Sequence, residues 1–176
     1  GFIFLNGLLY WIYVVLTQYG HLPGPVGVFF LLALNAYLAV YFGAFGYLFR
    51  FISARYPLAE ILLAPALWVT LEYVRGFLFS GFPWELLGYS QYRFLPQIQI
   101  AEITGVYGLS FLIVLVNVSI YKFLLQGPKA GWFAAGRHLI LPGILLLGSN
   151  LYGVYRLEQI QGQLKNEPSF RVVLAQ

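Results

Sequence analysis

Charge is what this sequence has least of. Only 9% of its 176 residues are charged and 60% are hydrophobic, with a mean hydropathy of +0.77. Soluble domains carry roughly 25% charged residues and about 45 to 50% apolar ones. No charged side chain occurs between Gly1 and Phe49, a stretch that suits two membrane-crossing helices of about 20 residues each. The composition therefore predicts an all-α integral membrane protein.

Cysteine is absent as well. No disulfide, thiolate metal site or thioester can therefore form on a side chain of these residues. Gly-rich phosphate loops and paired-histidine metal motifs are also missing from the sequence, so we predict neither a cofactor nor a bound metal. Basic residues fall in the predicted connections between spans instead of on one soluble face, so nucleic acid is not an expected partner.

Five apolar segments predict a bundle of about five transmembrane helices within residues 1–157. These segments are Phe2–Tyr19, Val26–Phe49, about Leu58–Phe79, about Ile98–Leu125 and about Leu139–Leu157. Pro23 and Pro25 separate the first two, because proline cannot donate a backbone hydrogen bond. Three asparagines inside the spans are predicted to hydrogen-bond between helices, namely Asn35, Asn117 and Asn150.

Positive charge is shared unevenly between the connections. One side of the bundle holds Arg50, Arg55, Lys122, Lys129 and Arg137, and the other holds only Arg75 and Arg93. Because cytoplasmic loops carry an excess of lysine and arginine, the first side is predicted to be cytoplasmic. Gly1 is then also cytoplasmic, and five spans place the chain after Leu157 on the outer side.

The two ends of the sequence predict a piece of a longer protein. Gly1 is neither an initiator methionine nor the start of a basic signal-peptide n-region. At the other end, residues 158–176 leave the membrane pattern, and Phe170–Gln176 contains a short β-branched apolar run typical of a buried strand. One strand has nothing to pair with, so we expect a soluble domain to begin there.

Polar residues concentrate in one stretch, Glu72–Gln91, which we predict to be a loop at a membrane face. Glu72 and Arg75 are three residues apart, so on a helix their side chains share a face. Counted back from Phe79, Glu72 lies about 10 Å inside the outer end of its span. Charge at that depth requires pairing or a wet cavity, which leaves a structural pair or a lipid-headgroup site in which Arg75 holds a phosphate.

The second half of this stretch contains the other candidate binding residues. Trp84 follows the rigid Gly81-Phe82-Pro83 turn, and tryptophan is enriched at headgroup depth whatever the function. Trp84 is therefore either a plain interfacial anchor or part of a floor beneath an external domain. Tyr89 and Gln91 are candidates for hydrogen bonds to a substrate at the same loop.

Six short motifs together resemble the bacterial apolipoprotein N-acyltransferase family. They are Trp11–Val14, Gly20–Pro25, Ala64–Trp68, Glu72–Gly76, Gly81–Trp84 and Gly88–Gln91. The resemblance extends over essentially the whole chain, and the last two motifs are its most specific part. Members of this family have further spans before this region, then a periplasmic nitrilase-like α/β domain, then a last span. The resemblance thus identifies Phe170–Gln176 with the opening strand of that domain.

The resemblance implies a two-step acyl transfer in the cytoplasmic (inner) membrane of a bacterium. A cysteine of the nitrilase-like domain takes an acyl chain from a phospholipid and passes it to the diacylglyceryl-cysteine of an apolipoprotein. The family's catalytic Glu, Lys and Cys lie in that domain, so residues 1–176 alone are expected to be inactive. They are expected to hold the lipid substrates, which lowers the entropic cost of bringing two lipids together.

Three alternatives remain on the residues alone. A transporter or channel is equally apolar, although it usually shows internal repeats and broken helices at matched positions. A non-catalytic membrane scaffold needs only the helices. A Ser-His pair is compatible with the predicted topology, since His21, Ser80 and Ser90 fall on the outer side, but neither serine has nucleophile-elbow spacing.

Overall fold

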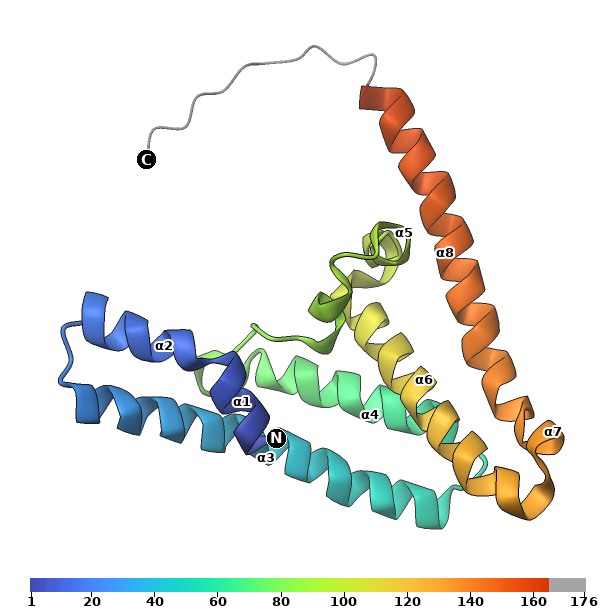
Figure 1. Ribbon diagram of the computed structural model, residues 1–176, viewed down its shortest axis with the longest axis horizontal. Coiled ribbons are helices and arrows are strands. Elements are labelled where there is room, and N and C mark those ends of the chain that lie inside the picture. Colours follow the sequence, from blue (N-terminus) through green and yellow to red (C-terminus); the bar gives the residue numbers. More distant parts are fainter. Residues whose placement is uncertain (165–176) are drawn as a thin grey trace. The chain divides into compact units, whose positions relative to one another are not determined.

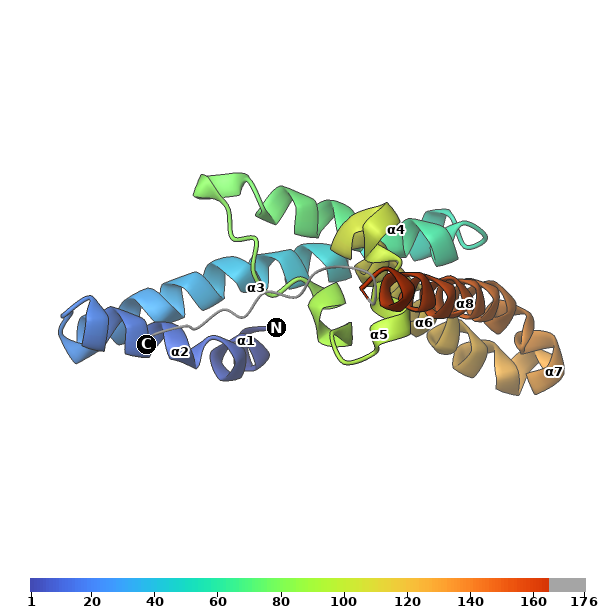
Figure 2. The same cartoon turned by 90° about the horizontal axis from the view of Figure 1, so that it is seen from above.

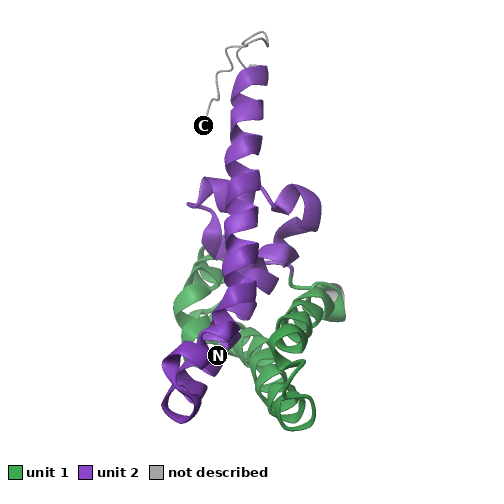
Figure 3. Ribbon diagram, turned by 90° about the vertical axis from the view of Figure 1, so that its right-hand side faces the viewer, with its two compact units in different colours: residues 1–82 green, residues 83–176 purple. Residues whose placement is uncertain are grey.

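The computed structural model describes residues 1–164, which fall into two compact units (Figure 3). The first unit is Gly1–Phe82, and the second begins at Pro83. The strand predicted at Phe170–Gln176 lies outside the described residues. Helices make up most of the described chain, and no strand occurs between residues 1 and 164.

The first unit is built around one long helix (Figure 1). Its elements are α1 (Phe2–Leu8), α2 (Tyr10–Val14), a π-helical turn η1 (Val15–Tyr19), α3 (Gly24–Arg55), α4 (Glu60–Arg75) and a 3-10 turn η2 (Leu78–Ser80). Both α1 and α4 pack against α3. The buried core of the unit joins α1, α3 and the chain after η2, through Leu5, Leu9, Leu38 and Phe82.

A bend at Leu9 breaks the first predicted span. The helices on either side of it are bent by 56°, so Phe2–Tyr19 is either one broken span or a re-entrant loop. Leu9 has φ −105° and ψ 11°, outside the helical region, and its side chain is fully buried in the core of the unit. The chain therefore changes direction at a residue whose side chain is part of the buried core.

The third predicted span is shorter than expected. Helix α4 has 16 residues, a length of about 24 Å, whereas a bilayer core is about 30 Å thick. The helix ends at Arg75 and not at Phe79, because Phe77 leaves the helical region (φ −123°) and Phe79 adopts a left-handed conformation (φ 51°).

The second unit is a hairpin of two long helices with short elements beside it (Figure 2). Its elements are a 3-10 turn η3 (Leu87–Gln91), α5 (Leu95–Ile98), α6 (Ala101–Ala130), α7 (Trp132–Ala135) and α8 (Arg137–Leu164). Helices α6 and α8 pack against each other, and α7 lies in the turn between them. Helix α8 passes the predicted domain boundary at residue 157 and includes residues 158–164.

Within residues 1–164, three helices are long and apolar enough to cross a membrane, namely α3, α6 and α8. The bent α1–α2 pair is a fourth if it counts as one span. Large apolar side chains remain exposed along these helices, as expected where lipid replaces water. The chain is a helical membrane protein, and the number of five spans stays a prediction.

Only one of the three asparagines bonds between elements as predicted. The Asn150 amide of α8 donates to Gln97 of α5. Asn117 instead donates to the Ile113 carbonyl of its own helix at 2.7 Å. Asn35 is fully buried, and neither polar atom of its side chain has a hydrogen-bond partner within the described part of the chain. The expectation is therefore wrong for Asn117 and Asn35.

Candidate functional site

Glu72 and Arg75 lie in the last turn of α4, and each is 3% exposed. Both line one small cavity of about 10 Å³, together with Tyr41, Phe42, Trp68 and Leu71. A cavity of this volume holds about one water molecule. Because the helix ends at Arg75, Glu72 is one turn from its end and not about 10 Å inside it. The Arg75 cation in this last turn is also stabilised by the negative end of the helix macrodipole.

A loop closes back onto the end of α4 directly after Arg75. The Phe82 amide donates to the Arg75 carbonyl at 2.9 Å, and the Phe82 side chain enters the core of the unit. Gly81 has φ +85°, and a Cβ atom there would lie 2.1 Å from the Gly76 carbonyl oxygen. Glycine is therefore required at position 81 for the loop to close.

Two tyrosines of α3 support this loop, and the sequence analysis did not identify them. The Tyr37 and Tyr41 hydroxyl groups are 2.7 Å apart, and Tyr37 donates to the Leu78 carbonyl at 3.3 Å. Each hydroxyl has a single proton, so Tyr41 must donate to Tyr37 when Tyr37 donates to Leu78. The Tyr37 ring also meets the Phe79 ring edge-on at 5.9 Å. The sequence indicated a contact between Tyr37 and Tyr41 only through their spacing of four residues, which places both on one face of a helix.

Trp84 begins the polar part of the second unit and has an exposed ring. It is 56% exposed and lies two residues after the buried Phe82. Glu85, the next residue, has a left-handed backbone (φ 59°) that redirects the chain before η3. An exposed tryptophan at the end of a membrane segment is consistent with an interfacial position.

The Gly88-Tyr89-Ser90-Gln91 motif forms a 3-10 turn packed directly on α6. The Gly88 amide donates to the Ser110 hydroxyl at 2.9 Å, and a Cβ atom at Gly88 would lie 2.5 Å from the Val106 carbonyl oxygen. Tyr89 points outward and is 51% exposed. Ser90 donates to the Leu87 carbonyl at 2.8 Å and accepts from Gln91, so its hydroxyl bonds to the turn itself and not to a histidine.

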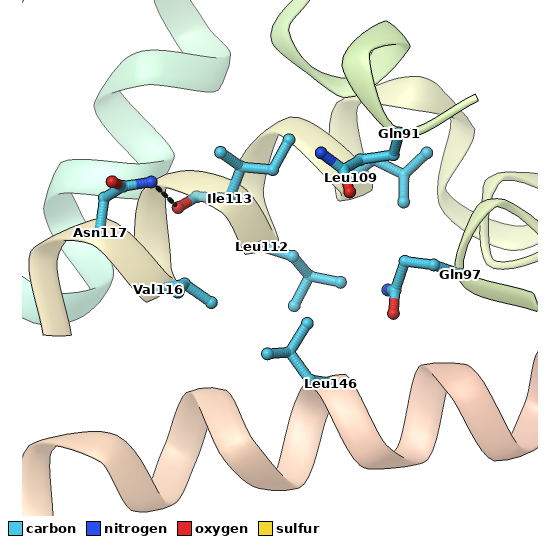
Figure 4. A pocket seen from close by; sticks show the side chains of 8 residues that line it. All are labelled: Gln91, Gln97, Leu109, Leu112, Ile113, Val116, Asn117 and Leu146. Carbon is cyan, nitrogen blue, oxygen red and sulfur yellow. Dashed lines mark hydrogen bonds between the residues drawn. The ribbon is translucent and has the colours of Figure 1, made fainter. Parts of the chain in front are cut away.

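Gln91 reaches a cavity of about 240 Å³ within the second unit (Figure 4). Its walls are mostly apolar and come from α6 and α8, where Leu112 and Leu146 face each other. Its polar lining residues are Gln91, Gln97 and Asn117. An apolar cavity with a few polar groups is typical of small-molecule sites, although this one is below the usual 300 to 1,000 Å³.

Gln97 ties α5 to α8 beside this cavity. It donates to the Ser149 hydroxyl at 2.8 Å and accepts from the Asn150 amide. Gly153 allows the two elements to touch, because a Cβ atom there would overlap the Pro96 carbonyl, at 1.7 Å from its oxygen. These partners are more than 50 residues apart, so local spacing gave no signal for them.

The five predicted site residues thus divide between the two units. Glu72 and Arg75 line a small cavity in the first unit, whereas Trp84, Tyr89 and Gln91 belong to the second. Trp84 and Tyr89 are exposed, and Gln91 is half-buried at the larger cavity. No group of three metal-binding side chains occurs within residues 1–164.

The long apolar helices and the polar loop among them define a polytopic membrane protein. A family model described as the apolipoprotein N-acyltransferase N-terminal domain matches residues 1–119. That match covers more than half of the 176 residues. The chain belongs to the apolipoprotein N-acyltransferase family.

Curated relatives agree with this assignment. An apolipoprotein N-acyltransferase of Geobacter metallireducens is 48% identical over 158 residues, which make up 89% of this chain and 30% of that protein. One from Nitrosomonas europaea is 40% identical over 119 residues, 65% of this chain and 24% of the relative. One from Haemophilus ducreyi is 31% identical over 166 residues, 94% of this chain and 30% of the relative. The chain spans less than a third of the length of these relatives.

Proposed function

We propose that this chain is the membrane part of an N-acyltransferase that moves an acyl chain from a phospholipid to the N-terminal diacylglyceryl-cysteine of an apolipoprotein. The observation that carries the proposal is the family match over residues 1–119, which includes both the Gly81–Trp84 and Gly88–Gln91 motifs. The name of each matched relative states the same activity for that relative.

Because residues 1–176 contain no cysteine, we assign them to binding and orienting the lipid substrates. Acyl transfer through a thioester needs a thiolate nucleophile, and none occurs in residues 1–176. A nitrilase-like domain after α8 would supply it, as the resemblance of Phe170–Gln176 implies. Helices that hold both lipids near that nucleophile contribute by proximity, since both substrates are already confined to the membrane.

The exposed residues of the second unit are the better candidates for lipid contact. Trp84 and Tyr89 offer ring faces and a hydroxyl to a headgroup or a glycerol ester, and Gln91 offers an amide at the edge of the larger cavity. We assign Glu72 and Arg75 a positioning role, because both side chains are buried and line a cavity of only about 10 Å³.

The proposed location is the bacterial cytoplasmic membrane, with Gly1 in the cytoplasm and the chain after α8 in the periplasm. The basic residues of the connections support this orientation, since five lie on one side and two on the other. The loop that contains Trp84 then faces the periplasm, on the same side as the external domain.

An acyl-transfer assay of the full-length protein tests the proposal. In phospholipid vesicles with a diacylated lipopeptide acceptor, mass spectrometry should show the mass of one additional acyl chain on the acceptor amine. Trp84→Ala should raise the KM for lipid more than it lowers kcat, since Trp84 is assigned to binding. Tyr47→Ala, which removes an exposed aromatic side chain of α3, is the control and should leave both values near wild type. Absence of the new acyl chain from a correctly inserted wild-type protein contradicts the proposal.

A further inference from the structure

The turn between α6 and α8 has a charge pattern that the acyl-transfer proposal does not use. Lys129 and Arg137 are both exposed, and neither has an ion-pair or hydrogen-bond partner within the described residues. The acids of the second unit up to residue 164 lie at the other ends of its elements. Glu102 is in the first turn of α6, Glu158 is near the end of α8, and Glu85 precedes η3.

One hydrogen bond within the turn joins the two segments that carry the cations. His138 of α8 and Gln126 of α6 are hydrogen-bonded at 2.9 Å. Lys129 follows Gln126 by three residues, and Arg137 immediately precedes His138. This bond therefore ties together the two segments that carry the cations. We call residues 126–138 the basic turn.

Trp132 is fixed within the basic turn by its packing. Its ring is 53% exposed, packs 5.3 Å from the Phe123 ring and fills the space over Gly127, where a Cβ atom would lie 2.2 Å from it. The neighbouring Phe133 is fully exposed. A fixed tryptophan beside an exposed phenylalanine favours the interface of the bilayer, which is the depth of lipid phosphate groups.

Helix stability alone does not account for the charges. Lys129 is in the last turn of α6, where a cation is favourable, but Arg137 opens α8, where a cation opposes the positive end of the helix dipole. Two exposed cations on segments that the Gln126–His138 bond joins, with no acid of the second unit up to residue 164 in the same turn, are complementary to a lipid phosphate.

We propose that the basic turn binds the headgroup of an anionic phospholipid, with Lys129 and Arg137 as its phosphate contacts. Arg137 offers a guanidinium fork suited to two phosphate oxygens, and Lys129 offers a compact point charge. Trp132 and Phe133 sit among the acyl chains beside that headgroup. The site is independent of acyl transfer, because it lies at the end of α6 opposite to the Gly88–Gln91 motif.

Native mass spectrometry of the full-length protein, titrated with phosphatidylglycerol or phosphatidylcholine, tests the proposal. The wild type should bind phosphatidylglycerol more tightly than phosphatidylcholine, and Lys129→Gln with Arg137→Gln should weaken phosphatidylglycerol binding about fivefold for each charge removed. Lys129→Arg with Arg137→Lys should retain most of the preference. Arg93→Gln, a basic residue outside the turn, is the matched control and should leave binding unchanged.

Two outcomes overturn the proposal. Equal affinity of the wild type for the two lipids does so, as does unchanged phosphatidylglycerol binding by the double glutamine variant. A third measurement labels an engineered thiol in the turn to find which side of the membrane it faces. If the double glutamine variant changes this side and leaves phosphatidylglycerol binding unchanged, the charges act only as a topology signal and the proposal also fails. None of these measurements involves acyl transfer, so the proposed function is tested separately.

Discussion

Arg156 and Glu102 form a two-bond ion pair between α8 and the first turn of α6. The Arg156 Nε atom lies 2.7 Å from Glu102 Oε2, and its Nη2 atom lies 2.7 Å from Oε1. The Tyr152 hydroxyl donates to Oε2 at 3.3 Å, and Arg156 also donates to Gln159 at 3.1 Å. The pair fixes α8 to α6 just before α8 continues to Leu164, from which the proposed external domain would extend.

Exchanging the two charges of this ion pair should preserve most of its contribution to stability. Glu102→Arg or Arg156→Glu alone places like charges together and should lower the Tm of the full-length protein slightly, because exposed ion pairs contribute little. The double variant restores an opposite-charge pair and should recover most of the lost Tm. Each single-variant effect should shrink at high salt, and additive effects in the double variant would contradict the pairing.

Closure of the loop after α4 should depend on glycine at position 81. Gly81→Ala should destabilise the protein by about 1–3 kcal/mol from the backbone conformation alone, with a further cost because the new Cβ would clash with the Gly76 carbonyl. Gly46→Ala is the matched control, since Gly46 is helical with nothing within 4 Å of an added Cβ, and it should gain about 0.5–1 kcal/mol. Thermal unfolding checks both variants, and equal effects would refute the loop geometry.

The two tyrosines of α3 should not be equivalent. Tyr37→Phe removes the hydroxyl that bridges Tyr41 and the Leu78 carbonyl, so we expect a loss of about 1–2 kcal/mol and faster amide hydrogen exchange in residues 76–82. Tyr41→Phe keeps the bond to Leu78 and should cost about 1 kcal/mol, with little change in exchange. Identical exchange in the two variants would show that Tyr37 does not hold the loop.

Attachment of α5 to α8 should depend on Gln97. Gln97→Leu removes its bonds to Ser149 and Asn150, and we expect a loss of about 1–2 kcal/mol, the upper range for polar contacts between membrane helices. Gln99→Leu is the control, because the Gln99 side chain bonds only to the Leu95 carbonyl nearby in the chain. Thermal unfolding of both variants provides the comparison, and a larger loss from Gln99→Leu would contradict the assigned role.

The sequence predicted features that depend on composition and on short spacing. Low charge and long apolar segments gave the helical membrane class, and α3, α6 and α8 overlap three of the predicted spans. The separation of three residues between Glu72 and Arg75 was enough to place both at one cavity. The resemblance of the two loop motifs agreed with the family match.

Other features depend on backbone geometry or on long separations, which apolar patterning does not encode. The bend at Leu9 follows Asn6 and Gly7 in a segment that has no charge and no proline, and averaged hydropathy does not show it. The early end of α4 follows from the left-handed Phe79 and from Gly81, not from a loss of hydrophobicity. The Arg156–Glu102 pair joins residues 54 apart, and only the packing of α6 on α8 brings them together.

A chimeric enzyme tests the central claim most directly. Residues 1–157 would replace the matched segment of the Geobacter metallireducens apolipoprotein N-acyltransferase, and transfer of an acyl chain from phospholipid to a diacylated lipopeptide would be measured by mass spectrometry. If these residues are the membrane part of such an enzyme, the chimera should acylate the lipopeptide amine. A chimera that inserts with the correct topology and keeps its external domain folded, yet transfers no acyl chain, would contradict the account.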